Sequence, residues 1–474
     1  MHDRNMQDSG KMDRRHFLQR TAAGASAAAV GGSMLQAESP KKPPTTAPET
    51  KVDPAKLIWR SKKPTMDYRR LGRTNYMVSR IVAGIGGNDM IWRRMMDRGM
   101  NYFDTAACYL GGNHEIELGR LFRAFRDDLW ITTKPSDVAG FSKIDEEVRK
   151  LYLEAMKDFL GKGEGDLLGL HKQAIEKQKK TGEKPDLRPA GKRMARLYTE
   201  KLDESLTRKM RIDHVDCYMM HGVEIPWMFD CPEVWEAHEK AHKTGKVKHF
   251  GISVHKHHKD VLAAVVEANK RGPWKIDLVM AGVNPESFDH FKPELTALKK
   301  QDVGIIAMKT SGIKNRPMDG REAKFKSLMG GKSYNEWERA KLWMLHLTEG
   351  LIDGCIAVMT SNKEMEKDLA LPMVKLSAQA ERELRAMVKL EMAGSCTLCG
   401  RCETNCPQHI AVTDMIRYHA YIYQYDEKDL ARRLYAQAGY DPAEVCNNCG
   451  ACAEVCPANV PITALLRELS ADLA

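Results

Sequence analysis

Apolar and polar positions alternate in a repeating order from about residue 66 to residue 376. Each short apolar stretch is followed by a charged stretch whose apolar residues recur with the period of a helix. The apolar stretches span residues 81–87, 101–107, 129–135, 215–221, 249–255, 278–285, 303–309 and 355–360. Strands that alternate with helices form a parallel sheet, so these units predict an α/β fold that closes into a (β/α)₈ barrel.

Two segments depart from this alternation. The sequence "DYRRLGRTNYMVSRI" (67–81) precedes the first unit and predicts two short strands about a "GRTN" turn, which would cap the bottom of the barrel. An insertion, about residues 140–200, follows the third strand and therefore leaves from the face where barrel active sites lie. A lid or docking surface and a plain solvated insertion both stay open for it.

The N-terminal residues predict an export signal. Residues 1–37 contain adjacent Arg14 and Arg15 in "RRHFL", then an Ala/Gly-rich run that ends at Ala37. This resembles a twin-arginine signal and predicts a periplasmic protein; a basic tail is the alternative. The run is too short and too weakly apolar for a stable membrane anchor. Residues 38–65 are rich in Pro, Thr and Lys and predict a linker.

Composition narrows the class of protein. The 474 residues are 43% hydrophobic and carry a formal net charge of +10. The positive charge is diffuse and not interleaved with aromatic residues, so we expect no nucleic-acid binding. Of the twelve cysteines, four are scattered singly and predict buried hydrophobic side chains rather than a disulfide framework: Cys108, Cys217, Cys231 and Cys355.

Four polar residues fall at or just after the ends of predicted barrel strands. Asp104 lies in "FDTA", Lys134 in "TTK" and His221 in "MMHG", and Tyr109 follows Asp104 by about one turn. A nearby ammonium group lowers the pKa of a tyrosine toward the working range, and an aspartate can hold that ammonium in place. A histidine can bond a carbonyl oxygen. The four residues together predict a catalytic group that donates a proton to oxygen.

The barrel resembles the aldo/keto reductases. The segments that carry the resemblance are "YRRLGRTNYMVSRI", "GMNYFDTAACY", "ITTKP", "RIDHVDCYMMHG", "HFGISVH" and "GIIAMK", which occur in family order over about residues 66–376. The resemblance implies NADPH-dependent reduction of a small carbonyl substrate. It implies that Tyr109 is the acid and that Lys134 and Asp104 adjust the pKa of Tyr109. It also implies that His221 orients the carbonyl group.

The cofactor positions match the family less well. The resemblance places Ser253 on the nicotinamide carboxamide, and Thr360 and Ser361 on the adenosine phosphate. The position of the arginine that clamps the 2′-phosphate of NADP holds Glu364 instead, which would repel a phosphate. The family's Asn and Gln at the carboxamide are replaced by Val254 and Met280. NADP, NAD and no nicotinamide at all therefore stay open.

The remaining eight cysteines form two runs of the pattern C-x₂-C-x₂-C-x₃-C-P, the spacing of bacterial ferredoxins. Two [4Fe–4S] clusters are predicted; structural zinc is the alternative, but zinc sites lack the third close cysteine. In two-cluster ferredoxins the fourth cysteine of each run binds the other cluster. The expected ligand sets are Cys396, Cys399, Cys402 and Cys456 for one cluster and Cys446, Cys449, Cys452 and Cys406 for the other.

The spacing between the runs predicts a helical cluster domain. Cys406 and Cys446 are separated by 39 residues with helical periodicity, which resembles an α-helical ferredoxin over residues 377–474. Residues 378–394 predict the helix that joins it to the barrel.

Three functions follow from this organisation. The chain could be an oxidoreductase for a carbonyl or alcohol, with clusters that relay electrons to or from a partner protein. It could be a reductase whose clusters only brace the C-terminus. It could also be an electron-transfer or assembly module that uses the barrel as a non-catalytic scaffold. The first is the principal prediction.

Overall fold

The computed structural model describes residues 52–473, apart from residues 137, 141–142, 163–166, 225, 311–319 and 424–427. The predicted export signal (1–37) and the linker up to residue 51 lie outside the described residues.

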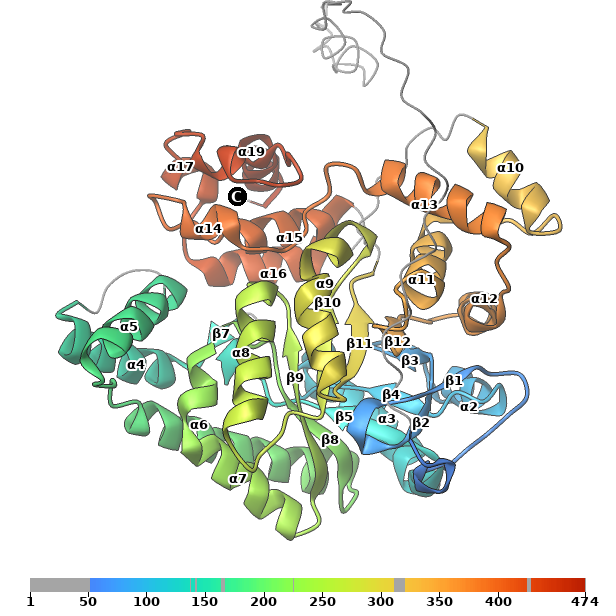
Figure 1. The fold of residues 1–474 in the computed structure, drawn as a ribbon, viewed down its shortest axis with the longest axis horizontal. Helices are drawn as coiled ribbons and strands as arrows, with labels where there is room; N and C mark the ends of the chain where they lie inside the picture. Colours follow the sequence, from blue (N-terminus) through green and yellow to red (C-terminus); the bar gives the residue numbers. More distant parts are fainter. Residues whose placement is uncertain are drawn as a thin grey trace, which may run out of the picture. The chain divides into compact units, whose positions relative to one another are not determined.

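Eight parallel strands close into a barrel (Figure 1), which confirms the predicted fold class. Each strand falls within or at the edge of one of the apolar stretches seen in the sequence. In chain order the barrel strands are β3 (Ile81–Ala83), β4 (Tyr102–Asp104), β5 (Trp130–Thr133), β8 (Val215–Met220), β9 (Val247–Val254), β10 (Leu278–Gly282), β11 (Gly304–Met308) and β12 (Gly354–Ala357).

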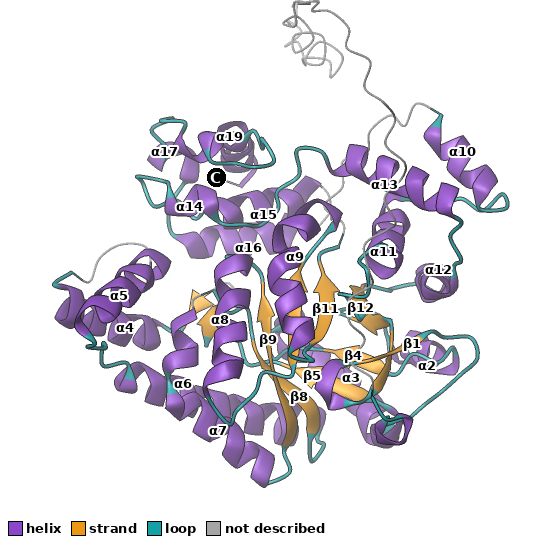
Figure 2. Cartoon of the chain, in the orientation of Figure 1, coloured by secondary structure: helices purple, strands orange, loops and turns teal. Residues whose placement is uncertain are grey.

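Helices surround this barrel, as the secondary-structure view shows (Figure 2). They pack through apolar side chains against the outer face of the strands and form one continuous core with it. The helices around the barrel are α2 (Asp89–Asp97), α3 (Asn113–Ala124), α6 (Arg188–Asp203), α7 (Pro232–Lys243), α8 (His258–Arg271), α9 (Pro285–Lys300), α10 (Arg321–Leu328), α11 (Glu336–His346) and α12 (Asn362–Ala370).

The inside of the barrel is filled by large side chains, among them Tyr102, Trp130 and Met280, which are almost completely buried. A hairpin of β1 (Tyr68–Arg70) and β2 (Met77–Ser79) closes the bottom, as the sequence predicts. Gly72 in its turn has φ +49°, and a Cβ atom there would lie 2.3 Å from the backbone nitrogen of Gly304. The barrel therefore has one open end, at the carboxyl ends of its strands.

The insertion after β5 is helical. After a small hairpin of β6 (Ala139–Gly140) and β7 (Lys143–Ile144), it forms α4 (Glu146–Leu160) and α5 (Leu167–Thr181). Tyr152 of α4 stacks on Trp227, in the loop after β8, with ring centroids 4.5 Å apart. This contact anchors α4 to the barrel, and the role of the insertion stays open.

The C-terminal helical region, residues 378–473, contains no strand among its described residues. The predicted joining helix is confirmed as α13 (Ala378–Met392), which packs against α9, α10 and α11. Among the described helices, none has the length and apolar character that a membrane crossing requires. The remaining helices are α14 (Arg401–Thr404), α15 (Val412–Tyr423), α16 (Lys428–Ala438), α17 (Pro442–Val445), α18 (Ala451–Glu454) and α19 (Ile462–Leu473).

A group of charged residues joins the C-terminal helical region to the open end of the barrel. Lys256, just after β9, lies 2.9 Å from Glu224 of the barrel and 3.1 Å from Asp414 of α15. Glu403 of α14 lies 3.9 Å from the same ammonium, and Arg417 binds Asp414 at 2.6 Å. We call these five residues the interface ion cluster. Although burial opposes ionisation, Lys256 and Arg417 hold the pKa of Asp414 well below its usual range.

Two histidines next to Lys256 also contact the C-terminal helical region. His257 lies 3.4 Å from Glu403, and a Cβ atom on Gly400 would lie 2.4 Å from its ring. The ring of His258 hydrogen-bonds the carbonyl oxygen of Leu398 at 3.2 Å. Gly400 also has φ +77°, so only glycine fits this close approach without strain.

We predict that Lys256→Met destabilises the protein by about 3–5 kcal/mol, because three largely buried carboxylates would lose their shared cation. The measurement is the urea midpoint of unfolding, followed by tryptophan fluorescence. Lys270→Met is the matched control, since Lys270 forms an exposed ion pair with Glu267 and its loss should cost less than about 1 kcal/mol. An unchanged midpoint for Lys256→Met would contradict this role.

Candidate functional site

The structure brings the four predicted catalytic residues together at the open end of the barrel. Asp104 is the last residue of β4, Lys134 follows β5 and His221 follows β8. Tyr109 begins a short 3₁₀ turn after β4. Its ring lies 5.9 Å from that of His221, and its hydroxyl lies 3.4 Å from the Lys134 ammonium. The barrel strands therefore hold all four side chains within one site.

Lys134 is almost completely buried and is held by three other contacts. Its ammonium donates to both carboxylate oxygens of Asp104 at 2.6 Å and to the carbonyl oxygen of Thr105 at 2.8 Å. These contacts are all shorter than the distance to Tyr109. The carboxylate of Asp104 therefore compensates most of the positive charge of Lys134, which weakens the effect of that charge on the Tyr109 hydroxyl.

This compensation corrects one expectation from the sequence. Lys134 was expected to lower the pKa of Tyr109, but that pKa is raised well above its ordinary value of 10. Burial is the main cause, and the negative charge of Asp104 adds to it. The Tyr109 hydroxyl thus keeps its proton at neutral pH and is suited to donate it rather than to act as a base.

His221 is neutral at physiological pH, since burial lowers its pKa well below 6.5 and Lys134 adds to the effect. Its Nδ1 atom lies 3.8 Å from the sulfur of Cys108, the scattered cysteine nearest the site. Neutral imidazole can donate one hydrogen bond to a substrate oxygen.

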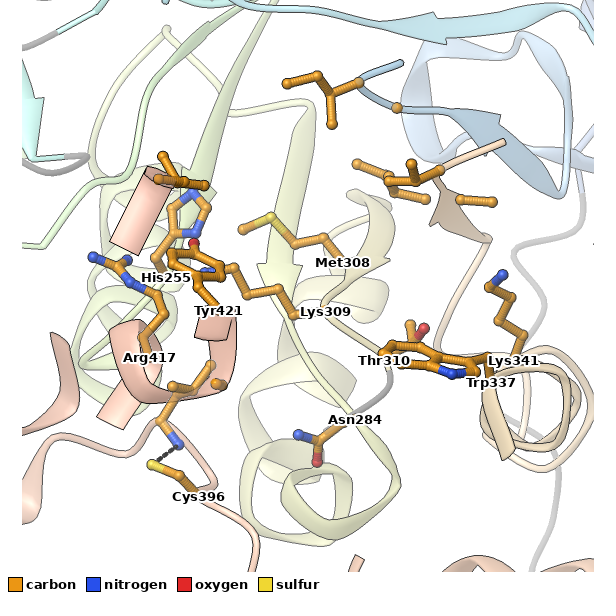
Figure 3. A pocket seen from close by; sticks show the side chains of 18 of the residues that line it. His255, Asn284, Met308, Lys309, Thr310, Trp337, Lys341, Cys396, Arg417 and Tyr421 are labelled. Carbon is orange, nitrogen blue, oxygen red and sulfur yellow. Dashed lines mark hydrogen bonds between the residues drawn. The ribbon is translucent and has the colours of Figure 1, made fainter. Parts of the chain in front are cut away.

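The site opens into a large cavity of about 1230 Å³ (Figure 3). Tyr109 and Met308 line it from the barrel. Arg417, Tyr421 and Cys396 line it from the C-terminal helical region. A predicted proton donor and a predicted cluster ligand therefore face the same space, although they lie 287 positions apart in the sequence.

The cysteines gather in the two sets expected for crossed ligation. Cys396 lies close enough to Cys399 and Cys456 for their charges to interact, and Cys402 stands in the same relation to Cys396 and Cys399. The second set surrounds one small hollow and comprises Cys406, Cys446, Cys449 and Cys452.

The two cysteine loops have the same backbone form. Positive φ angles recur exactly fifty positions apart, at Leu398 and Asn448, at Gly400 and Gly450, and at His409 and Asn459. A left-handed conformation is uncommon for residues other than glycine and is often found where a backbone wraps a ligand. Its repetition in both loops indicates two equivalent sites.

The donor set fits an iron–sulfur cluster. Backbone N–H groups of Leu398 and Val460 donate to the sulfurs of Cys396 and Cys456, each at 3.4 Å, as is usual around cluster thiolates. Within the described part of the chain, no group of three His, Cys, Asp or Glu is arranged to hold a single metal ion.

The nucleotide positions are less favourable for NADP. The carboxylate of Glu364 accepts hydrogen bonds from the backbone N–H groups of Thr360 and Ser361, at 2.9 and 3.0 Å, and from the Thr360 hydroxyl at 2.9 Å. The donors expected to hold a phosphate are thus taken by the chain's own carboxylate, and the 2′-phosphate of NADP does not fit there.

The carboxamide positions differ from the family in the same way. Ser253 is completely buried, and its hydroxyl oxygen accepts the backbone N–H of Gly222 at 2.7 Å. Met280, where the family has Gln, packs inside the barrel with the apolar side chains. Met280 offers no polar group for a nicotinamide carboxamide, whereas the Ser253 hydroxyl keeps its hydrogen as a donor, so its role stays a prediction.

Comparisons with known families match the two parts of the chain separately. Residues 89–313 match the aldo/keto reductase family, and residues 381–461 match the 4Fe-4S dicluster domain. The barrel is an aldo/keto reductase domain, and the C-terminal helices are a 4Fe–4S dicluster domain. Together they support an oxidoreductase with iron–sulfur electron relay.

Solved structures of low sequence identity align with the reductase domain. A thermostable aldo-keto reductase in complex with epalrestat is 17% identical, covering 68% of this chain and 100% of its own, with a TM-score of 0.48. One from Brucella melitensis is 16% identical, covering 68% and 99%, with a TM-score of 0.44. One from Bacillus halodurans, in its holo form, is 18% identical, covering 68% and 96%, with a TM-score of 0.45.

Sequence reasoning missed the residues that the dicluster domain brings to the reductase cavity. Arg417 and Tyr421 of α15 both line it, and the charge of Tyr421 is a minor contribution to the raised pKa of Tyr109. It also missed Lys309, directly after β11. In the sequence, the basic segment "HKHHK" (255–259) after β9 was a local sign that the open end of the barrel contacts acidic groups.

The crossed ligand sets can be tested with paired substitutions. We predict that Cys396→Ser with Cys456→Ser abolishes one cluster and retains about half of the iron, because both residues bind the same cluster. Cys396→Ser with Cys406→Ser should damage both clusters. Iron analysis and low-temperature EPR of the purified proteins measure this. The reverse pattern would show that each run binds its own cluster.

The Glu364 carboxylate can be tested by nucleotide binding. We predict that the wild-type protein binds NADPH no more tightly than NADH. Glu364→Arg should strengthen NADPH binding about 10-fold or more, since it frees the backbone donors and adds a cation. Isothermal titration calorimetry measures both, and Glu366→Arg on the same helix is the control with the same change of charge. Equal NADPH affinity in the wild-type and Glu364→Arg proteins would refute this role of Glu364.

Proposed function

We propose that the chain interconverts a small carbonyl compound and its alcohol at Tyr109, with two [4Fe–4S] clusters that relay electrons between this site and a redox partner protein. The main support for this proposal is the shared cavity, which is lined by Tyr109 of the reductase domain and by Cys396 of the dicluster domain. A cluster bound by Cys396 and a substrate held at Tyr109 would share this cavity, so electrons could pass between them without a further cofactor.

The side chains of the site support the protonation half of this reaction. Carbonyl reduction takes up two electrons and two protons, which matches two centres that each pass one electron. Tyr109 is protonated and faces the cavity, so it can give one proton to the substrate oxygen, and solvent that enters the cavity supplies the second proton, at carbon. Asp104 and Lys134 fix the geometry behind the phenol, and neutral His221 can hold the same oxygen by a hydrogen bond.

The proposal does not include the nicotinamide chemistry of the family. Glu364 favours NAD over NADP, and the buried Met280 weakens the carboxamide grip. The proposal therefore places the electron source in a partner protein. Export through the twin-arginine pathway is part of the same proposal, because Arg14 and Arg15 match its signal and free NADPH is scarce outside the cytoplasm.

The test is a single-turnover experiment on the holoprotein. The clusters are reduced with dithionite under anaerobic conditions, the excess is removed, and a panel of aldehydes and ketones is added while cluster absorbance is followed. We predict reoxidation by at least one carbonyl compound, and a rate about 100-fold lower or more in Tyr109→Phe with unchanged cluster spectra.

The control is Tyr68→Phe, the same substitution in the bottom hairpin, where Tyr68 donates to the carbonyl oxygen of Gly99 at 2.7 Å. It should leave the reoxidation rate unchanged. Clusters that stay reduced with every carbonyl would exclude the relay and favour clusters that only brace the C-terminus. A normal rate in Tyr109→Phe would exclude the phenol as the proton donor.

A further inference from the structure

Lys309 is a half-buried lysine whose side-chain nitrogen is buried and forms no ion pair with the described residues. Its side chain leaves the end of β11 and reaches toward Tyr421 and His255 in the cavity (Figure 3). The ammonium nitrogen is shielded from solvent and has no hydrogen-bond partner in the described part of the chain. It lies 6.0 Å from the centre of the Tyr421 ring. An unpaired ammonium in such a place is costly, so its presence needs an explanation.

A second cation faces the same region. Arg417 of α15 is 7% exposed and lines the cavity, and its Nε atom is buried without a hydrogen-bond partner. One of its terminal nitrogens binds Asp414, so the guanidinium is only partly satisfied. Burial lowers the pKa of Lys309 well below its usual range, and repulsion by Arg417 adds to this effect, while the more distant charge of Asp414 opposes it.

The carboxylates near these cations are already engaged. Lys256 forms ion pairs with Asp414, Glu224 and Glu403, and these three carboxylates do not line the cavity. The carboxylates that do line it are each bound elsewhere within the protein: Asp104 to Lys134, Glu338 to Lys367, Asp368 to Lys341, and Glu364 to the start of α12. Among the described residues, Asp414 acts on the charge of Lys309 only from a distance, and none forms an ion pair with it.

The backbone holds Lys309 in this position. Its φ is +53°, a left-handed conformation that costs free energy in a lysine and turns the side chain at the end of the strand. Its neighbour Met308 also lines the cavity. The strand end thus presents the lysine at the mouth of the barrel, close to where Tyr109 and His221 would hold a substrate oxygen.

We propose that Lys309 and Arg417 bind an anionic oxygen group, a carboxylate or a phosphate, of the molecule that occupies this cavity. A carboxylate or phosphate oxygen satisfies both cations by charge-assisted hydrogen bonds and removes the cost of the unpaired ammonium. The ligand is thereby an anion: a keto or hydroxy acid if the group belongs to the substrate, a nucleotide if it belongs to a cofactor. This inference names the ligand class of the site proposed above and rests on that proposed function.

The proposal can be tested by isothermal titration calorimetry on the cluster-loaded protein. The parent protein carries Tyr109→Phe, so that the probes bind without being turned over. The probes are pyruvate, its neutral ester methyl pyruvate, inorganic pyrophosphate and NADH. We expect at least one anionic probe to bind, and Lys309→Met to weaken that binding about 10- to 100-fold while methyl pyruvate is unaffected. Loss confined to pyruvate assigns the group to a substrate, and loss confined to pyrophosphate and NADH assigns it to a cofactor.

Two further variants separate binding from structure. Lys309→Arg should restore most of the affinity, and Lys363→Met, an exposed lysine that lines the same cavity, should leave it unchanged. Because Lys309 has no ionic partner, Lys309→Met should unfold at the same urea concentration as the parent or a higher one. Equal binding of every anionic probe to the parent and Lys309→Met proteins, or no binding of any of them to the parent, would overturn the proposal.

These outcomes are distinct from failure of the proposed function. Anion binding that depends on Lys309 would stand even if the reduced clusters were never reoxidised by a carbonyl compound. Conversely, a working relay with no dependence on Lys309 would leave the proposed function intact and refute this inference alone.

Discussion

The arrangement of this protein depends on one buried group of charges, the interface ion cluster around Lys256. Three carboxylates from two domains converge on one ammonium, and each would be costly to bury alone. The close contact of His257 with Gly400 leaves little room for the domains to shift. Because the cluster lies at the open end of the barrel, it brings the dicluster domain onto the reductase site, and the large cavity is a consequence of that contact.

Enclosure by a second domain changes the chemistry of the site. In an open barrel the phenol of Tyr109 would face water and have its ordinary pKa, whereas burial here raises that pKa well above 10. Lys134 is neutralised by Asp104, so its main effect is on position rather than on the charge of the phenol. The site is thus suited to proton donation toward a substrate whose electrons arrive from the cluster side. Lys309 and the partly satisfied Arg417 are buried basic groups of the cavity lining that such a substrate could still satisfy.

Much of this could be predicted from the sequence, because it depends on local spacing. The strand and helix periods predicted the barrel, and the strand ends predicted where Asp104, Lys134 and His221 meet. The cysteine runs predicted the 4Fe–4S dicluster domain. The sign of the pKa shift of Tyr109 was wrong because it depends on how deeply the phenol is buried and on the charge of Asp104, and burial cannot be derived from local spacing. Arg417 and Lys309 were missed for the same reason: each is an ordinary basic residue until the two domains meet. Only the packed structure shows which charges are left without partners.

The central claim is that one cluster lies at the cavity that contains Tyr109. Anomalous diffraction at the iron edge, from crystals of the holoprotein, tests it most directly. The account predicts two compact iron peaks, one of them surrounded by Cys396, Cys399, Cys402 and Cys456 and bordering the cavity at Tyr421. Iron peaks separated from the open end of the barrel, with solvent between the two domains, would contradict it.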